Sequence, residues 1–297
     1  MNGFYNILKP PGMSSAAVVA VMRRLTGEKR TGHAGTLDPE AAGVLPIMTG
    51  KATRLFDYLV DKEKEYEAVC AFGASTDTQD ATGTVLETGD RYPDLDTVRE
   101  KAQALTGEIV QRPSAFSAIK VGGKPLYVRA RKGEDVEVPE RTVTVHSIEV
   151  TGEEPGHGVS LRIRCGRGTY IRTICDDLGK LCGCPAHMRS LVRTRSGVFT
   201  TETGITLEEA RTLAAEGRLG EKMLAPDWPI QHLRRVDIPA RFAKQTTAGA
   251  KIPAAGIAED AAEEDNLRVY LAGRFWGIMR RDGNSLVWKA QIAPEET

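Results

Sequence analysis

The regular alternation of apolar and polar side chains is the feature that most constrains the fold of this chain. From Glu65 to Gly73 every second residue is apolar, namely Tyr66, Ala68, Cys70 and Phe72. The segment VSLRIRC, residues 159–165, has the same period and directs Arg162 and Arg164 to its polar side. A period of two predicts strands, because successive side chains of a strand point to opposite faces of the sheet. Residues 142–150, TVTVHSIEV, are expected to form another strand.

Helices are predicted on both sides of these strands. Ser14 or Ser15 can cap a helix that runs to about Leu25 and stops at Gly27. A short apolar strand is expected at 44–48, and further helices at about 52–60, from Asp94 or Asp96, from Thr169 to Gly183 and within 206–217. This mixture predicts an α+β fold.

The composition changes near 221–239, where Pro226, Pro229 and Pro239 interrupt the pattern. Three short strands are predicted beyond it, LRVYLAG, RFWGIMRRDGN and SLVWKAQIA, with a hairpin turn at Asp282-Gly283. We therefore expect a domain of residues 1–232 and a small β-barrel of residues 233–297.

Basic residues are concentrated in two segments, although the chain as a whole has 40 basic and 40 acidic residues. Residues 112–132 contain six basic residues and no acid, and residues 162–195 contain eight basic residues against two acids. Segregated charge of this kind can bind a polyanion, although it is also compatible with ordinary solvated surface.

Several classes of protein are disfavoured. The N-terminal MNGFYNILKPPG has no secretion signal, the five cysteines form no regular framework, and the longest apolar run, AAVVAVM, is too short for a membrane span. We therefore expect a cytoplasmic protein without membrane contact. The phosphate-loop, dinucleotide-binding and zinc-protease signatures are missing, and Cys182, Cys184 and His187 in CGCPAH are interpreted as structural rather than as a metal site. No cofactor or metal is expected.

One carboxylate, Asp38, stands in the glycine-rich stretch GHAGTLDPEAAGVLPI, residues 32–47. Pro39 disfavours the α region at Asp38, and the glycines allow the backbone to approach a ligand, which would display the carboxylate on a loop. Alternatively, Asp38 caps a helix that begins at Pro39.

A second candidate site is GRGTYIRT, residues 166–173. If the chain is extended there, Tyr170 and Arg172 share one side, and a helix beginning at this point adds its positive end to Arg172. Together they would stabilise an anion. A surface arginine and a core tyrosine are the simpler alternative.

Five motifs in this order resemble the TruB family of tRNA pseudouridine synthases: KPPGMSS (9–15), GHAGTLDPEAAGVLPI, KEYEAVCAFGASTDTQDATG (64–83), PSAFSAIKVGGKPLY (113–127) and GTYIRTICDDLG (168–179). The resemblance covers about residues 4–197. It implies a catalytic domain with a central mixed β-sheet flanked by helices, followed by a C-terminal PUA-like RNA-binding β-barrel. It also implies isomerisation of uridine 55 in the T-arm of tRNA to pseudouridine.

The resemblance assigns roles to individual residues. Asp38 is implied to be the catalytic aspartate, Arg172 its partner, and Tyr66 the tyrosine that stacks on the target base. Binding of the flipped base and its RNA is implied for His33, Tyr170, Leu191, Lys9 and Lys64. Contacts to the RNA backbone are expected from the basic segment 112–132, as a mobile clasp, through Arg112, Lys120, Lys124 and Arg129. Residues 162–195 are expected to supply a second basic contact.

A single carboxylate suffices for this reaction, which cleaves the bond from uracil N1 to ribose C1′ and rejoins the base through C5. An aspartate is ionised at neutral pH and can attack C6, attack C1′ or remove the 2′-proton. We expect tRNA as the partner, no obligate protein partner and a monomer. Two other functions remain open: an RNA-folding module without catalysis, and the catalytic subunit of a guide-RNA particle that acts on ribosomal RNA.

Overall fold

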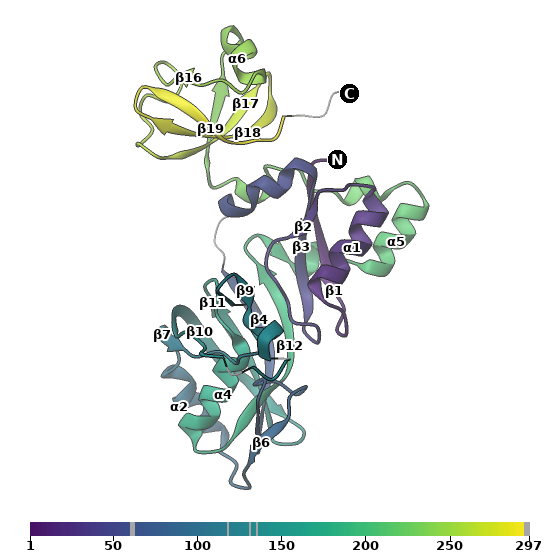
Figure 1. Cartoon of the computed structure of the whole chain (residues 1–297), viewed down its shortest axis with the longest axis vertical. Helices are drawn as coiled ribbons and strands as arrows, with labels where there is room; N and C mark the ends of the chain where they lie inside the picture. Colours follow the sequence, from purple (N-terminus) through teal and green to yellow (C-terminus); the bar gives the residue numbers. More distant parts are fainter. Residues whose placement is uncertain (60–62, 118, 131, 135, 294–297) are drawn as a thin grey trace. The chain divides into compact units, whose positions relative to one another are not determined.

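The computed structural model describes residues 1–59, 63–117, 119–130, 132–134 and 136–293. The chain, whose helices and strands are labelled in Figure 1, divides into two compact units. Unit 1 consists of Met1–Pro39, Gly43–Asp61 and Gly197–Thr297, and unit 2 of Glu40–Ala42 and Lys62–Ser196.

In unit 1 the strand β1 (Gly3–Lys9) is antiparallel to β3 (Ala42–Thr49) and parallel to β14 (Ile205–Thr206). The short β2 (Thr31–His33) pairs with β3. This mixed pairing confirms the expected mixed sheet. Helix α1 (Ser15–Thr26) begins where predicted, because the Ser14 hydroxyl accepts a hydrogen bond from the Ala17 amide, and it ends at Gly27 with φ of 67°. Helix α5 (Leu207–Ala215) contacts α1.

The helix predicted at about 52–60 is the 3₁₀-helix η1 (Gly50–Tyr58), and Val60 lies outside the described residues. In a 3₁₀-helix, side chains three residues apart lie on the same side. Ala52 and Leu55 are fully buried and Tyr58 is partly buried against the same core. The spacing of three therefore matches the tighter helix.

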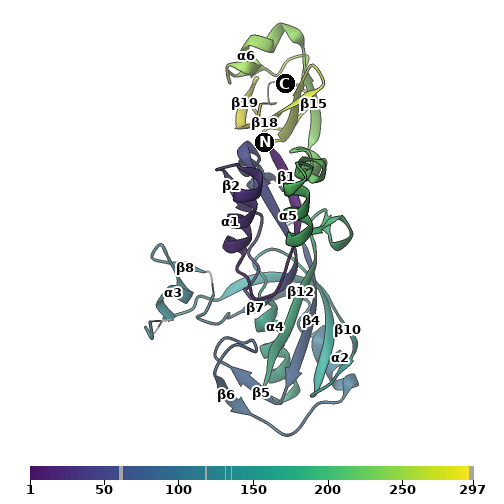
Figure 2. The same ribbon diagram turned by 90° about the vertical axis from the view of Figure 1, so that its right-hand side faces the viewer.

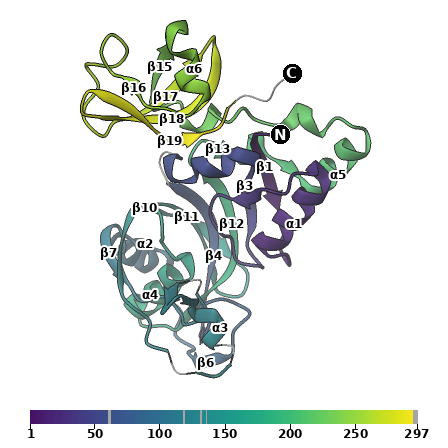
Figure 3. The ribbon, with the colours of Figure 1, turned by 45° about the horizontal axis from the view of Figure 1, so that its top comes forward.

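Unit 2 is built on five antiparallel strands, in the order β12 (Ala186–Ser196), β4 (Lys64–Phe72), β11 (Gly158–Cys165), β10 (Arg141–Glu154) and β7 (Gly107–Gln111). Helices α2 (Leu95–Gln103) and α4 (Ile171–Cys182) lie together and pack on this sheet (Figure 3). The predicted alternation is confirmed: Ala68, Cys70 and Leu161 are buried, whereas Arg162 and Arg164 are exposed.

Two hairpins complete unit 2: β5 (Ala74–Thr76) with β6 (Val85–Thr88), and β8 (Lys120–Val121) with β9 (Lys124–Pro125). The second hairpin turns at Gly122 and Gly123, which have φ of 59° and 81°. Together with α3 (Leu126–Ala130) it stands out from the sheet of unit 2 (Figure 2).

The C-terminal strands form a curled half-barrel in the order β15 (Arg234–Ile238), β17 (Asn266–Leu271), β18 (Arg274–Asp282), β19 (Ser285–Gln291) and β16 (Ile252–Pro253). This confirms the predicted small barrel. The remaining elements are short: β13 (Phe199–Thr200), η2 (Thr201–Thr203), η3 (Leu219–Lys222), η4 (Trp228–Ile230), η5 (Ala240–Phe242) and α6 (Ala243–Thr247).

One apolar core in unit 1 joins the half-barrel to the N-terminal strands. It contains Phe4 of β1, Leu55 of η1 and Ile278 of β18, all fully buried. The boundary predicted at residues 232 and 233 stays a prediction, with Ile230 in this core and Leu233 packed against it. Among the described residues, no helix is long and apolar enough to span a membrane.

Candidate active site

Asp38 lies on an irregular loop between β2 and β3 and is half-buried. No helix begins at Pro39, so the alternative in which Asp38 caps a helix is wrong. The physical reason is strand pairing: residues 43–49 pair with β1 over seven consecutive positions, which requires extended backbone shortly after Pro39. The carboxylate is therefore carried by a loop.

The backbone on both sides of Asp38 is fixed by two buried side chains. Before it, the Ser15 hydroxyl accepts a hydrogen bond from the Leu37 amide and donates one to the Leu37 carbonyl, each 2.9 Å long. After it, the Lys9 ammonium donates to the Pro39 carbonyl at 2.7 Å. These contacts hold the loop on α1 and on the end of β1.

Lys9 is expected to bind substrate, and in the structure its ammonium is bonded to backbone carbonyls of the protein itself. Its side chain is only 1% exposed, and its ammonium also donates to the carbonyls of Pro10 at 2.8 Å and Met13 at 2.5 Å. The ammonium thus ties the KPPGMSS turn to the loop of Asp38. A direct contact of Lys9 with RNA stays a prediction. His33, at the end of β2, is half-buried and pairs with Ile47 of β3.

The other predicted site residues belong to unit 2. Tyr66 on β4 and Leu191 on β12 are 6% and 7% exposed, and Lys64 opens β4 in a half-buried position. Arg193 on β12, which the sequence analysis does not single out, is fully buried and pairs with Tyr66 across the two strands. A buried guanidinium in such a position points to a polar site rather than to ordinary core.

Tyr170 and Arg172 stand at the start of α4. Tyr170 is the N-cap residue, with extended backbone and no side-chain capping bond, and the guanidinium of Arg141 lies 5.8 Å from its ring centroid. Arg172 is in the first helical turn and is 6% exposed. The positive end of the α4 dipole therefore adds to the charge of Arg172, as predicted. The pairing of Arg172 with Asp38, which belongs to unit 1, stays a prediction.

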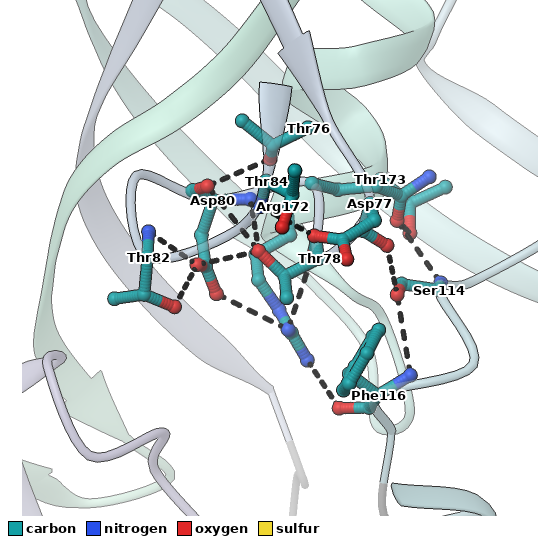
Figure 4. Close-up of polar contacts among 11 residues, drawn as sticks. Thr76, Asp77, Thr78, Asp80, Thr82, Thr84, Ser114, Phe116, Arg172 and Thr173 are labelled. Atoms are coloured by element: carbon teal, nitrogen blue, oxygen red, sulfur yellow. Dashed lines mark hydrogen bonds and ion pairs between the residues drawn. The ribbon is translucent and has the colours of Figure 1, made fainter. Parts of the chain in front are cut away.

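Asp80 is a partner of Arg172 that the sequence analysis missed. The Arg172 guanidinium donates to Asp80 Oδ2 at 3.2 Å, to the Thr78 carbonyl at 3.1 Å and to the Phe116 carbonyl at 3.5 Å (Figure 4). Burial raises the pKa of Asp80, but hydrogen bonds from Thr82 and Thr78 and the charge of Arg172 outweigh it and hold the pKa below its ordinary value. Asp80 is thus an anion that holds the guanidinium in place.

The turn that presents Asp80 is held by its own threonines. Oδ1 of Asp80 accepts hydrogen bonds from the Thr78 hydroxyl at 2.8 Å and from the Thr82 hydroxyl at 2.6 Å (Figure 4). The position of Gly83 admits no side chain, since a Cβ would lie 2.9 Å from the Thr78 amide nitrogen. The density of threonine and aspartate in STDTQDATG was the signal that could have indicated this turn.

The basic segment 112–132 is only partly described. Arg112 and Lys124 are exposed, while Arg129 donates to Glu134 in an ion pair of 2.8 Å. The side chain of Lys120, and Arg131 altogether, lie outside the described residues. A solvent-exposed pair of this kind contributes little to stability, so it leaves Arg129 able to exchange Glu134 for a phosphate. The RNA contacts of these residues stay predictions.

The arginines of β11 lie on the face opposite Tyr66. Register pairs Ile163 with Tyr66, so Arg162 and Arg164 point the other way. There Arg162 pairs with Glu149 at 3.0 Å and Arg164 with Glu63 at 3.8 Å. The second basic contact with RNA, predicted for residues 162–195, stays a prediction. If Arg162 and Arg164 take part in it, the RNA contacts the face of the sheet opposite Tyr66.

The cysteine and histidine cluster has no metal-binding arrangement. No group of three or more metal-ligating side chains occurs among the residues that the structure describes. His187 is engaged at Nδ1, 2.8 Å from the Ala74 carbonyl oxygen.

Comparison with known proteins agrees with this fold and these motifs. Residues 23–171 match the TruB family pseudouridylate synthase (N terminal domain), and residues 172–236 match the tRNA pseudouridylate synthase B C-terminal domain. Among curated relatives, tRNA pseudouridine synthase B of Bacillus licheniformis is 42% identical over 92% of this chain and 91% of its own. The tRNA pseudouridine synthase B of Alkaliphilus oremlandii is 39% identical over 96% of this chain and 95% of its own.

Solved structures give the same answer for the fold. The matching chain in a crystal structure of a Cbf5-Nop10-Gar1 complex is 29% identical with a TM-score of 0.70, over 94% of this chain and 78% of that chain. A second, in a structure of an H/ACA RNP bound to a substrate RNA containing 2'-deoxyuridine, is 26% identical with a TM-score of 0.73, over 98% and 85%. The fold is that of a pseudouridine synthase with a PUA-like C-terminal half-barrel. The chain belongs to the TruB family of pseudouridylate synthases.

Proposed function

We propose that this protein converts uridine 55 in the T-arm of tRNA to pseudouridine, without a cofactor. The observation that carries the proposal is the placement of Asp38: a carboxylate on an irregular loop whose backbone is fixed on both sides by Ser15 and Lys9. The names of the curated relatives, each a tRNA pseudouridine synthase B, support tRNA as the substrate.

In this proposal Asp38 is the nucleophile or base, and Arg172 is the cation that stabilises charge beside it. Arg172 suits that role because Asp80 and two backbone carbonyls hold its guanidinium and because it stands in the first turn of α4. A group that is fixed before the reaction needs little reorganisation in the transition state. Attack at C6, attack at C1′ and removal of the 2′-proton all begin from the anion of Asp38.

The target base must leave the folded T-loop, at a cost of a few kcal/mol in lost stacking and pairing. Tyr66 is proposed to stack on the flipped base, where an aromatic face contributes on the order of 1–3 kcal/mol. Leu191 and Tyr170 are proposed to line the base pocket, and His33 to fill the space that the base leaves.

RNA affinity is proposed to come from Lys64 and from the segment 112–132, through Arg112, Lys120, Lys124 and Arg129. The PUA-like domain, residues 233–297, is proposed to extend this contact. Such binding weakens with rising salt, because each neutralised phosphate releases counterions.

The test is release of tritium from uridine labelled at C5. A folded T-arm transcript should lose its label to water with purified protein alone, and a transcript with cytidine in place of uridine 55 should not. Asp38→Asn should bind the RNA within about threefold of wild type and release no label, since the amide is neither a base nor a nucleophile. Label retained with wild-type protein, alongside an active control enzyme, would reject the proposal.

A further inference from the structure

The side chain of Gln111 is fully buried at the end of β7, directly before the basic segment. Its amide makes two hydrogen bonds to one residue: Nε2 donates to the Tyr170 carbonyl and Oε1 accepts from the Tyr170 amide, each at 3.0 Å. The two residues are 59 positions apart in the chain. A side chain thus pairs with the backbone of Tyr170 as a neighbouring strand would.

This contact fixes the residue that precedes the first turn of α4. Tyr170 is the N-cap residue of α4, and its own side chain makes no capping bond. Its carbonyl already accepts the first helical bond, from the Ile174 amide at 3.2 Å. The bonds from Gln111 therefore set the backbone at the point where α4 begins, and Arg172 is two residues further on.

Two more contacts join the start of the basic segment to the same helical turn. The side-chain oxygen Oε1 of Gln79 accepts from the Ser114 amide at 3.1 Å and from the Thr173 hydroxyl at 2.9 Å. Arg172 donates to the Phe116 carbonyl (Figure 4). Gln79 also donates to Asp176 at 3.0 Å. Residues 111–116 are consequently attached to the first turns of α4 at three places.

We propose that Gln111 is a positioning residue for the reaction, one that links RNA held by the segment 112–132 to the placement of Tyr170 and Arg172. Gln79 is the second link. The inference rests on the proposed function. It assigns neither glutamine a contact with the base, because each acts through the backbone or side chain of α4.

The test separates positioning from stability. Gln111→Met keeps the length of the side chain and removes both hydrogen bonds. The single-turnover rate at saturating RNA should fall by about 10- to 100-fold, the size expected when a reacting group is misplaced by about 1 Å. The dissociation constant for the RNA should stay within about threefold, and amide hydrogen exchange at Tyr170 should speed up.

The matched control is Asn6→Leu. Nδ2 of the buried Asn6, on β1, donates to the Thr200 carbonyl at 2.7 Å and to the Thr203 hydroxyl at 2.8 Å. Loss of this amide should lower the melting temperature and leave the single-turnover rate unchanged. Gln79→Met is the second positioning variant, and at this half-buried site it should fold even if Gln111→Met does not.

A single-turnover rate within twofold of wild type in the folded variants would overturn the inference. So would a loss confined to RNA affinity. Wild-type protein without turnover rejects the proposed function instead, and that result is seen before any variant is compared.

Discussion

Asp80 and Arg172 form an ion pair of 3.2 Å in which the side chains are only 16% and 7% exposed. Breaking a buried pair by removing one partner costs about 3–5 kcal/mol, because the remaining charge stays buried without compensation. The pair therefore fixes the guanidinium at the start of α4 more firmly than the surface pair of Arg129 with Glu134 is fixed.

Asp80→Asn should lower turnover at saturating RNA by about tenfold or more while RNA affinity changes little. The amide still fills the space, but it neither neutralises Arg172 nor accepts from Thr78 and Thr82 as strongly. Single-turnover kinetics and filter binding measure the two quantities. Asp96→Asn is the control, since Asp96 pairs with Arg99 on the surface and its side chain is 92% exposed. Equal turnover in the two variants would contradict the prediction.

The Asp80 carboxylate should also make the free energy of unfolding fall in acid. The pKa of Asp80 is lowered below its ordinary value of 3.8, so its stabilisation is complete above that value and is lost as the pH falls through the folded-state pKa. The difference in unfolding free energy between wild type and Asp80→Asn should therefore shrink from about pH 5 to pH 3. Urea denaturation across this range measures it. A stability difference that does not change with pH would contradict a lowered pKa for Asp80.

Lys9→Met should reduce both stability and turnover. The change leaves the carbonyls of Pro10, Met13 and Pro39 without their donor, and a buried unsatisfied group costs about 1–3 kcal/mol. Because Pro39 follows Asp38, the loop should also lose its fixed position. Urea denaturation and single-turnover kinetics measure the two effects. Lys51→Met, at a half-buried lysine whose side chain makes no hydrogen bond within the described part of the chain, should leave both close to wild type.

The raised pKa of Tyr270 should make the free energy of unfolding fall at high pH. Burial and a hydrogen bond donated to Asp227 raise its pKa to about 12 from 10.0. Its contribution is complete below pH 10.0 and is lost as the pH rises through about 12. The stability difference between wild type and Tyr270→Phe should shrink over this interval. Ultraviolet titration should also show one late phenolate that the variant lacks, and its absence from wild type would contradict the assignment.

Removal of residues 233–297 should destabilise the remaining chain. The shared core joins Ile278 and Phe275 of the half-barrel to Leu55 and Ala52 of η1, so truncation exposes apolar surface on η1. A loss of several kcal/mol would lower the melting temperature by roughly 10 °C or more. Thermal unfolding and binding of an apolar dye test this. A truncated protein that melts at the temperature of the full chain would show that the domain is separable.

Local patterns predicted the elements well, because strand and helix periods are local properties. The alternation in β4 and β11 and the cap of α1 at Ser14 follow from neighbouring residues alone. The 3₁₀ character of η1 does not, because a spacing of three at Ala52, Leu55 and Tyr58 also fits an α-helix.

The polar links of the candidate site could not be predicted in this way. Asp80 and Gln111 reach their partners across 92 and 59 positions of the chain. A charged or amide side chain carries no sign of which distant backbone it will meet. The loop of Asp38 had two local interpretations, and strand pairing of residues 43–49 with β1 decided between them.

Lys9 has a consequence for chemical probing of this protein. Its ammonium is engaged by three carbonyls and almost completely buried, so it cannot meet an amine-reactive reagent while the turn is closed. Acylation of Lys9, followed by mass spectrometry, would therefore report how often the loop beside Asp38 opens in the folded enzyme.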